Sequence, residues 1–182
     1  QLGKRRRLRR RTRTIKEVPT VAVVGYTNAG KSTLLNHLTD SDVIAKDFLF
    51  ATLNPVSRRL RFPREREVII TDTVGFISNL PKDLLTAFRT TFEELHEADL
   101  LLHVVDASCH DVAQKMKVVQ DTLRELELND KPVITVFNKM DVCNPLEVEG
   151  LIMQYNGVAI CALNRNTFEP LLKYMETLLW PH

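Results

Sequence analysis

The segment Gly25-Tyr26-Thr27-Asn28-Ala29-Gly30-Lys31-Ser32 decides how the rest of the chain is interpreted. Its spacing, G-x-x-x-x-G-K-S, is that of a P-loop, in which backbone N–H groups converge on a polyphosphate and Lys31 reaches the terminal phosphates. Residues 20–24 before it form an apolar run, and the apolar residues of 33–38 after it suit one helix face. We therefore predict a strand, a phosphate-binding loop and a helix, with the Ser32 hydroxyl available to Mg²⁺.

The composition is that of one soluble α/β domain. The chain has 182 residues, of which 44% are apolar and 26% charged. No apolar run approaches the roughly 20 residues that cross a bilayer, so we expect no membrane insertion. The three cysteines, Cys109, Cys143 and Cys161, are widely spaced and lack a C-x-x-C pair. They are expected to be reduced thiols, which indicates the cytoplasm, and we expect a monomer.

The first 16 residues carry nine arginines and lysines and no acid, whereas the remainder has 16 basic and 23 acidic residues. Three interpretations stay open: a solvated disordered segment, a contact with RNA phosphates, or packing against a missing part of the protein. Because the chain begins with Gln1, we expect it to be cut from a longer protein. Residues 1–18 then form a basic linker from a missing N-terminal domain, and residues 19–182 form the folded domain.

Strands and helices are expected to alternate along the chain. The predicted strands are 20–24, 56–62, 67–71, 100–105, 132–137 and 158–162, and the predicted helices are 33–38, 81–95, 112–126 and 171–179. Segments 56–62 and 67–71 are predicted to pair as a hairpin. The remaining alternation indicates an α/β fold with a six-stranded, mostly parallel sheet and helices on both faces, with ligands at the carboxyl ends of the strands. The irregular stretch 41–55 is long enough to be functional.

Two more motifs follow predicted strands and would meet the P-loop at that edge. Asp72-x-x-Gly75 places a carboxylate that can hold Mg²⁺ through water and a glycine N–H that can meet a γ-phosphate. Asn138-Lys139-Met140-Asp141 places a carboxylate that can accept hydrogen bonds from N1–H and the exocyclic amine of guanine. Asn138 can also brace the P-loop, and the stem of Lys139 can lie along the base. The combination predicts binding of GTP and GDP in preference to ATP.

The order of these motifs resembles the GTP-binding domain of the translation-factor-related GTPases. Within that class the amino-acid sequence of four segments is similar to the HflX family and less similar to Obg-like relatives. These segments are residues 24–34, 49–53, 71–77 and 80–81. The resemblance covers residues 19 to 179. It implies a Ras-like P-loop GTPase fold, a separate N-terminal domain, a large ribosomal subunit and its RNA as partner, and a role in rescuing or splitting stalled ribosomes.

The resemblance also implies roles for individual residues. Lys31 would contact the β- and γ-phosphates, Ser32 and Thr52 would ligate Mg²⁺, and Gly75 would sense the γ-phosphate. The base-contacting S-A-K of such domains is here Cys161-Ala162-Leu163, in which Ala162 keeps its backbone N–H. The complete expected nucleotide-binding set is Gly25, Tyr26, Thr27, Asn28, Ala29, Gly30, Lys31, Ser32, Thr33, Asp72, Gly75, Asn138, Lys139, Asp141, Cys161, Ala162 and Leu163; the metal ligands are Ser32, Thr52 and Asp72; the catalytic residues are Lys31, Thr52, Gly75 and Asn28.

Slow hydrolysis is expected because Phe76 follows Asp72-x-x-Gly75, where Ras-like enzymes often carry a water-orienting Gln. Asn28 occupies the P-loop position whose Asn helps ligate K⁺ in the similar cation-dependent GTPases. The alternative is that Asn28 only braces the loop and the ribosome supplies the missing groups. Three functions stay open: a hydrolysing switch on the large ribosomal subunit, a nucleotide-dependent RNA- or ribosome-binding module with negligible turnover, and a relative acting in tRNA modification or ion transport.

Overall fold

The computed structural model describes residues 18–39, 56–64, 66–73 and 95–181. The strands are β1 (Thr20–Gly25), β2 (Val56–Phe62), β3 (Arg66–Asp72), β4 (Leu100–Asp106), β5 (Val133–Asn138) and β6 (Val158–Ala159). The α-helices are α2 (Lys31–Leu38), α5 (Val112–Glu125), α6 (Pro145–Tyr155) and α7 (Glu169–Leu179), with 3₁₀ turns η1 (Met140–Val142) and η2 (Arg165–Thr167). The predicted helix 81–95 and the loop 41–55 fall almost entirely outside the described residues.

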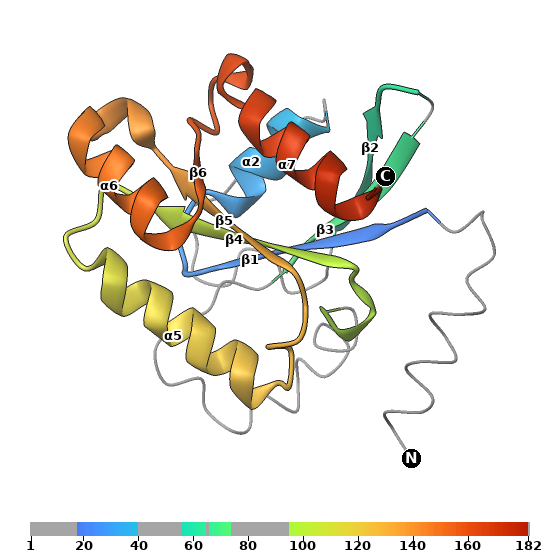
Figure 1. Ribbon diagram of the computed structural model, residues 1–182, viewed down its shortest axis with the longest axis horizontal. Coiled ribbons are helices and arrows are strands. Elements are labelled where there is room, and N and C mark those ends of the chain that lie inside the picture. The colour runs from blue at the N-terminus through green and yellow to red at the C-terminus, as the bar shows by residue number, and fades with distance from the viewer. Residues whose placement is uncertain (1–17, 40–55, 65, 74–94, 182) are drawn as a thin grey trace.

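The strands form one sheet in the order β2-β3-β1-β4-β5-β6. The β2–β3 pair is antiparallel and the other four pairs are parallel. Helices α2 and α7 cover one face and α5 lies against the other (Figure 1). The predicted α/β architecture with a six-stranded, mostly parallel sheet is therefore confirmed. Because parallel strands point the same way, the loops after β1, β3, β4 and β5 all leave from one edge.

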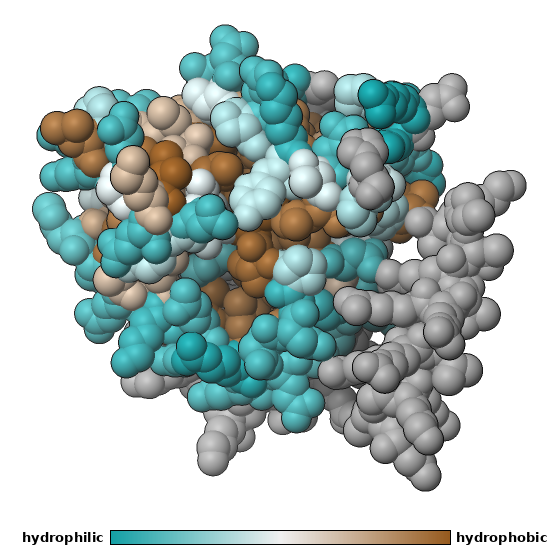
Figure 2. Space-filling view, in the orientation of Figure 1, coloured by the Kyte–Doolittle hydropathy of each residue, from teal (hydrophilic) through white to brown (hydrophobic). Residues whose placement is uncertain are grey.

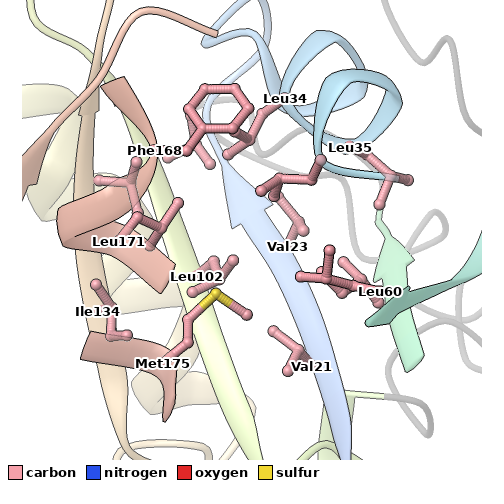
Figure 3. Close-up of a cluster of buried hydrophobic side chains, with 14 of the residues drawn as sticks. Val21, Val23, Leu34, Leu35, Leu60, Leu102, Ile134, Phe168, Leu171 and Met175 are labelled. Atoms are coloured by element: carbon pink, nitrogen blue, oxygen red, sulfur yellow. The ribbon is translucent and has the colours of Figure 1, made fainter. Parts of the chain in front are cut away.

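Side-chain alternation explains why both faces of the central strands are apolar. Val21 and Val23 of β1 pack under α2 and α7, whereas Ala22 and Val24 face α5. Along β4, Leu102 joins the first cluster. Figure 3 shows Val21, Val23 and Leu102 of the sheet. They pack against side chains of the two helices, namely Leu34, Leu35, Leu171 and Met175. A strand buried on both faces needs a mostly apolar sequence, and in β4 only His103 and Asp106 are polar.

The β2–β3 hairpin is tied to the end of α7. Arg66 donates to Glu176 at 2.9 Å, and its guanidinium lies 5.2 Å from the centre of the Trp180 ring. Phe62 meets Trp180 edge to face at 5.4 Å between ring centres. The β2–β3 hairpin is thus anchored to α7, and the Arg66–Glu176 contact joins residues 110 apart in sequence.

Two elements differ from the sequence-based prediction. The sixth strand was predicted over 158–162, but only Val158 and Ala159 pair with β5. Beyond them the backbone N–H of Cys161 donates to the Thr167 hydroxyl and that of Ala162 to the Asn138 side chain, so neither continues the ladder. Helix α6 was not predicted at all, because its apolar residues show no clear one-sided period and only Val148 is buried.

The signals for α6 lie at its ends. Asn144 caps the helix by accepting from the N–H of Leu146 at 3.0 Å, and Pro145 occupies the first turn. Asn156 closes it in the left-handed conformation at φ 50°. Its outer surface carries the exposed side chains Leu146 and Met153, and brown, apolar surface appears over α6 in Figure 2. Among the described residues, no helix has both the length and the apolar character that crossing a membrane requires.

Candidate functional site

The P-loop connects the end of β1 to the first turn of α2. Gly30 precedes the helix at φ 93°, and Asn28 is also left-handed at φ 62°. The N–H of Ala29 bonds the carbonyl of Tyr26 at 3.3 Å, which closes the turn. Free N–H groups at a helix N-terminus and the positive end of the helix dipole together favour a phosphate.

Lys31 is buried within this loop, with 8% of its surface exposed. Its ammonium donates to the carbonyl of Tyr26 at 3.2 Å. Burial lowers the pKa of Lys31, and the nearby Asp72 carboxylate acts in the opposite direction. A partly desolvated cation held beside backbone N–H groups is suited to the terminal phosphates of a nucleotide.

Ser32 and Asp72 meet although 40 residues separate them in sequence. The Ser32 hydroxyl donates to an Asp72 carboxylate oxygen at 2.7 Å, and Asp72 is 3% exposed. Thr73 holds the end of β3 against β1 by donating to the Val23 carbonyl at 2.5 Å. A hydroxyl and a carboxylate both offer hard oxygen ligands. Proteins commonly bind Mg²⁺ with one or two such side chains together with the phosphates of the substrate. The donor set therefore fits Mg²⁺.

Asn138 joins three loops through its side-chain amide. Its Nδ2 donates to the Ala29 carbonyl of the P-loop at 2.9 Å, and its Oδ1 accepts from the N–H of Ala162 at 2.8 Å. The predicted brace between Asn138 and the P-loop is present. Only 2% of the Asn138 surface is exposed, so both hydrogen bonds lie in the protein interior. Hydrogen bonds are stronger there than in water.

Lys139 follows in the left-handed conformation, and its ammonium pairs with the Asp106 carboxylate at 2.6 Å. Ser108 donates to Asp106 from both its backbone N–H and its hydroxyl, at 3.0 and 2.6 Å. Burial would raise the pKa of Asp106, but these bonds from Lys139 and Ser108 outweigh it and the pKa is lowered. Asp106 was not among the residues predicted for the site; its signal in the sequence is an acid that ends a buried strand.

Asp141 and the segment 161–163 lie at the rim. Asp141 is exposed, whereas Cys161 is buried and Leu163 is 72% exposed. Burial raises the pKa of the Cys161 thiol, and a hydrogen bond with Asp141 raises it further. This contact between Cys161 and Asp141 was not anticipated from the sequence.

The remaining predicted residues divide into two groups. Thr33 lies in the first turn of α2, where its carbonyl contacts the His37 ring at 2.9 Å. Gly25 ends β1 with no room for a side chain, since an added Cβ would meet the Val104 carbonyl. Thr52, Gly75 and Phe76 lie outside the described residues, so their roles stay predictions. Within the described part of the chain, no cluster of three His, Cys, Asp or Glu side chains could hold a metal ion.

A cavity of about 250 Å³, with a mixed polar and apolar lining, lies between the P-loop, the end of β4 and α5. We call it the α5 cavity. Its lining consists of Tyr26, Thr27, Asn28, Ala29, His103, Val104, Val105, Asp106, Cys109, Lys115 and Met116. It shares residues 26–29 with the P-loop, but its lining contains none of Ser32, Asp72 and Asn138.

His103 is expected to make stability depend on pH. Burial, helped by the charge of Lys31, lowers the pKa of His103 from 6.5 to about 4. Between these values the unfolded chain binds a proton that the folded chain does not, so stability rises with pH in this window. Over the 2.5 units, lowering the pH should cost about 3 kcal/mol of unfolding free energy.

Urea unfolding at several pH values between 6.5 and 4 tests this expectation. His103→Gln should flatten the pH dependence of the unfolding free energy. His110→Gln, which changes an exposed histidine a few residues away, should leave it as in the unchanged chain. An unchanged slope for His103→Gln would show that other groups carry the dependence.

Comparisons with known proteins agree with this geometry. A family model described as 50S ribosome-binding GTPase matches residues 20–139. The GTPase HflX of Caldanaerobacter subterraneus is 54% identical over 142 residues, which are 78% of this chain and 33% of that protein. The GTPase HflX of Escherichia coli is 45% identical over 147 residues, 81% of this chain and 34% of that protein. The chain spans about a third of the length of these curated relatives.

Solved structures give the same fold. Era from Aquifex aeolicus, bound to GDP·AlF₄⁻, superposes with a TM-score of 0.74 at 28% identity over 92% of this chain and 58% of that one. The G-domain of FeoB from Methanococcus jannaschii has a TM-score of 0.66 at 20% identity, covering 90% of this chain and 99% of that one. The second likeness concerns the fold alone.

Proposed function

The chain belongs to the HflX family, within the 50S ribosome-binding GTPases, and from this premise we propose that it is the GTP-binding and GTP-hydrolysing domain of a switch on the large ribosomal subunit. The observation that carries the proposal is the Asn138 amide, which ties the P-loop to Ala162, with the exposed Asp141 three residues further along the chain. This connection supports a site in which the P-loop would bind the phosphates and Asp141 would read the guanine. Rescue or splitting of stalled ribosomes, in the cytoplasm, is the proposed role of the whole protein.

Different residues of the chain would bind the phosphates and the base of the nucleotide. The P-loop N–H groups and Lys31 would orient the β- and γ-phosphates, which is most of what enzymes contribute to phosphoryl transfer. Ser32 and Asp72 would hold Mg²⁺, with Thr52 as a further proposed ligand; when bound, Mg²⁺ neutralises phosphate charge. Lys139, fixed by Asp106, would present its stem to the base while Asp141 accepts the two guanine donors.

The catalytic group that replaces a water-orienting Gln is proposed to be K⁺ held with the help of Asn28. The left-handed backbone of Asn28, at φ 62° in the P-loop, supports this proposal, because turns of this kind form concave sites that bind anions such as phosphate. A cation there would supply the charge that an arginine finger supplies elsewhere, at about 10³ to 10⁵ in rate. We also propose that residues 1–16, which lie outside the described part, add salt-sensitive affinity for ribosomal RNA.

Phosphate release from GTP, measured with and without purified large ribosomal subunits, tests the function. We expect slow release by the chain alone, faster release with subunits, and faster release in K⁺ than in Na⁺ at equal ionic strength. Asn28→Ala should remove the difference between the two cations. Asn129→Ala, an exposed amide outside the site, is the matched control and should keep it.

Three results would redirect the proposal. GTP-dependent binding to subunits without turnover would favour a binding module. A rate of GTP hydrolysis that is the same with and without subunits would favour a relative acting in tRNA modification or ion transport. Equal rates in K⁺ and Na⁺, with and without subunits, would remove K⁺ and leave Asn28 as a brace of the loop.

A further inference from the structure

Cys109 lies in the α5 cavity, outside the residues proposed to bind nucleotide. It is half-buried and follows β4 by three residues, just before α5 begins. The P-loop residues Tyr26 to Ala29 form another part of the lining. The thiol therefore stands in a cavity large enough for a small molecule.

A lysine is paired with this thiol. The Lys115 ammonium lies 3.1 Å from the Cys109 sulfur and 3.1 Å from the Asp111 carboxylate. It also lies 5.5 Å from the centre of the Tyr26 ring. The hydrogen bond with Cys109 is the main cause that raises the pKa of Lys115, followed in the same direction by Asp111. An adjacent ammonium favours the thiolate, which is the reactive form of cysteine.

His103 is a second, independent sign of a ligand in the α5 cavity. It is only 3% exposed, lines the cavity, and its ring has no hydrogen-bond partner among the described residues. With a pKa of about 4 it is neutral at pH 7, so one ring nitrogen can donate and the other accept. Because the ring lines the α5 cavity, a small polar molecule in that cavity can hydrogen-bond to it.

The other two cysteines lack this environment. Burial raises the pKa of Cys143, and the carboxylates of Asp106, Glu147 and Asp141 add to the effect. Burial likewise raises the pKa of Cys161, with Asp141 adding to it. Acidic neighbours disfavour a thiolate at these two positions, whereas the group in contact with the Cys109 sulfur is the Lys115 ammonium.

We propose that Cys109 is a peroxide-reactive thiol and that the α5 cavity admits hydrogen peroxide to it. The Cys109 thiolate attacks one peroxide oxygen, so a sulfur–oxygen bond forms while the oxygen–oxygen bond breaks. The departing hydroxide takes a proton from the Lys115 ammonium and leaves as water, and solvent returns the proton to Lys115. Sulfur is oxidised by two electrons to a sulfenic acid and the peroxide is reduced. A small thiol then condenses with the sulfenic acid to a mixed disulfide and releases water, and a second thiol molecule reduces this disulfide, which restores Cys109 and leaves the small thiol as its own disulfide.

The test treats the 182-residue chain with hydrogen peroxide, traps sulfenic acid with dimedone, and measures labelling at each cysteine by mass spectrometry. We expect Cys109 to react about tenfold faster than Cys143, because the Lys115 ammonium lies 3.1 Å from the Cys109 sulfur, whereas carboxylates surround Cys143. Lys115→Met should slow Cys109 to the rate of Cys143. Lys117→Met removes the same charge from an exposed position of α5 and should leave the rate at Cys109 unchanged.

Labelling at Cys143 in every variant reports whether the fold is kept, because that site does not contact Lys115. Equal reaction of Cys109 and Cys143 in the unchanged chain would overturn the proposal. Undiminished labelling of Cys109 in Lys115→Met would do so as well. None of these measurements uses GTP, so they stand or fall independently of the proposed hydrolysis.

Discussion

Replacing Gly30 by alanine is expected to abolish measurable nucleotide binding. Gly30 lies at φ 93°, a conformation in which a non-glycine residue costs about 1–3 kcal/mol. An added Cβ would also run into the Asn138 amide nitrogen. Relieving that collision would break the bond from Asn138 to Ala29, and an unsatisfied buried group costs about a further 1–3 kcal/mol. The backbone strain at residue 30 and the loss of the Asn138–Ala29 hydrogen bond would therefore both destabilise the P-loop.

Calorimetric titration with GDP measures the effect of Gly30→Ala. The matched control is Gly150→Ala in α6, where an added Cβ meets nothing within 4 Å. The control should keep GDP affinity and raise the unfolding free energy by about 0.5–1 kcal/mol, because alanine is the better helix former. If Gly30→Ala binds GDP as tightly as the unchanged chain, the proposed geometry of the P-loop is wrong.

The second large effect is expected from Asp141→Asn, which should change the preferred base from guanine to xanthine. In the proposed site the Asp141 carboxylate would accept from two guanine donors, whereas an amide could donate to the C2 carbonyl of xanthine. Where a site's polar groups would otherwise stay unpaired, discrimination reaches about 10⁴-fold. We therefore expect GTP affinity to fall by about 10³-fold or more, while xanthosine triphosphate binds.

Competition of GTP, xanthosine triphosphate and ATP against a fluorescent guanine nucleotide measures this preference. Asp121→Asn makes the same chemical change on exposed α5, where Asp121 pairs only with Arg124 in the bonds described, and should leave the preference for GTP intact. Equal competition by ATP and GTP in the unchanged chain would remove Asp141 as the base-reading group. Retained GTP preference in Asp141→Asn would lead to the same conclusion.

Local chemistry explains which elements could be predicted from sequence. The P-loop was predictable because its glycine and lysine spacing follows from backbone conformation and phosphate contact. The strands β4 and β5 carry continuous apolar runs, and α5 and α7 carry one-sided apolar patterns. Helix α6 lacks such a pattern, since tertiary contact buries only Val148, and therefore only its capping residues mark it.

The sequence by itself determined the strand–loop–helix of residues 20–38, the alternation of strands and helices, and the chemistry offered by Lys31, Asp72 and Asn138. Those features depend on neighbouring residues, whose spacing the sequence displays directly. Only the tertiary structure decided the partners of these groups. Asn138 meets Ala29 across 109 residues and Lys139 meets Asp106 across 33, while Cys109 and His103 share a cavity with Tyr26. The reason is physical: the strand order β3-β1-β4-β5 brings loops distant in sequence to one edge, and that order results from burying the whole sheet rather than from any local pattern.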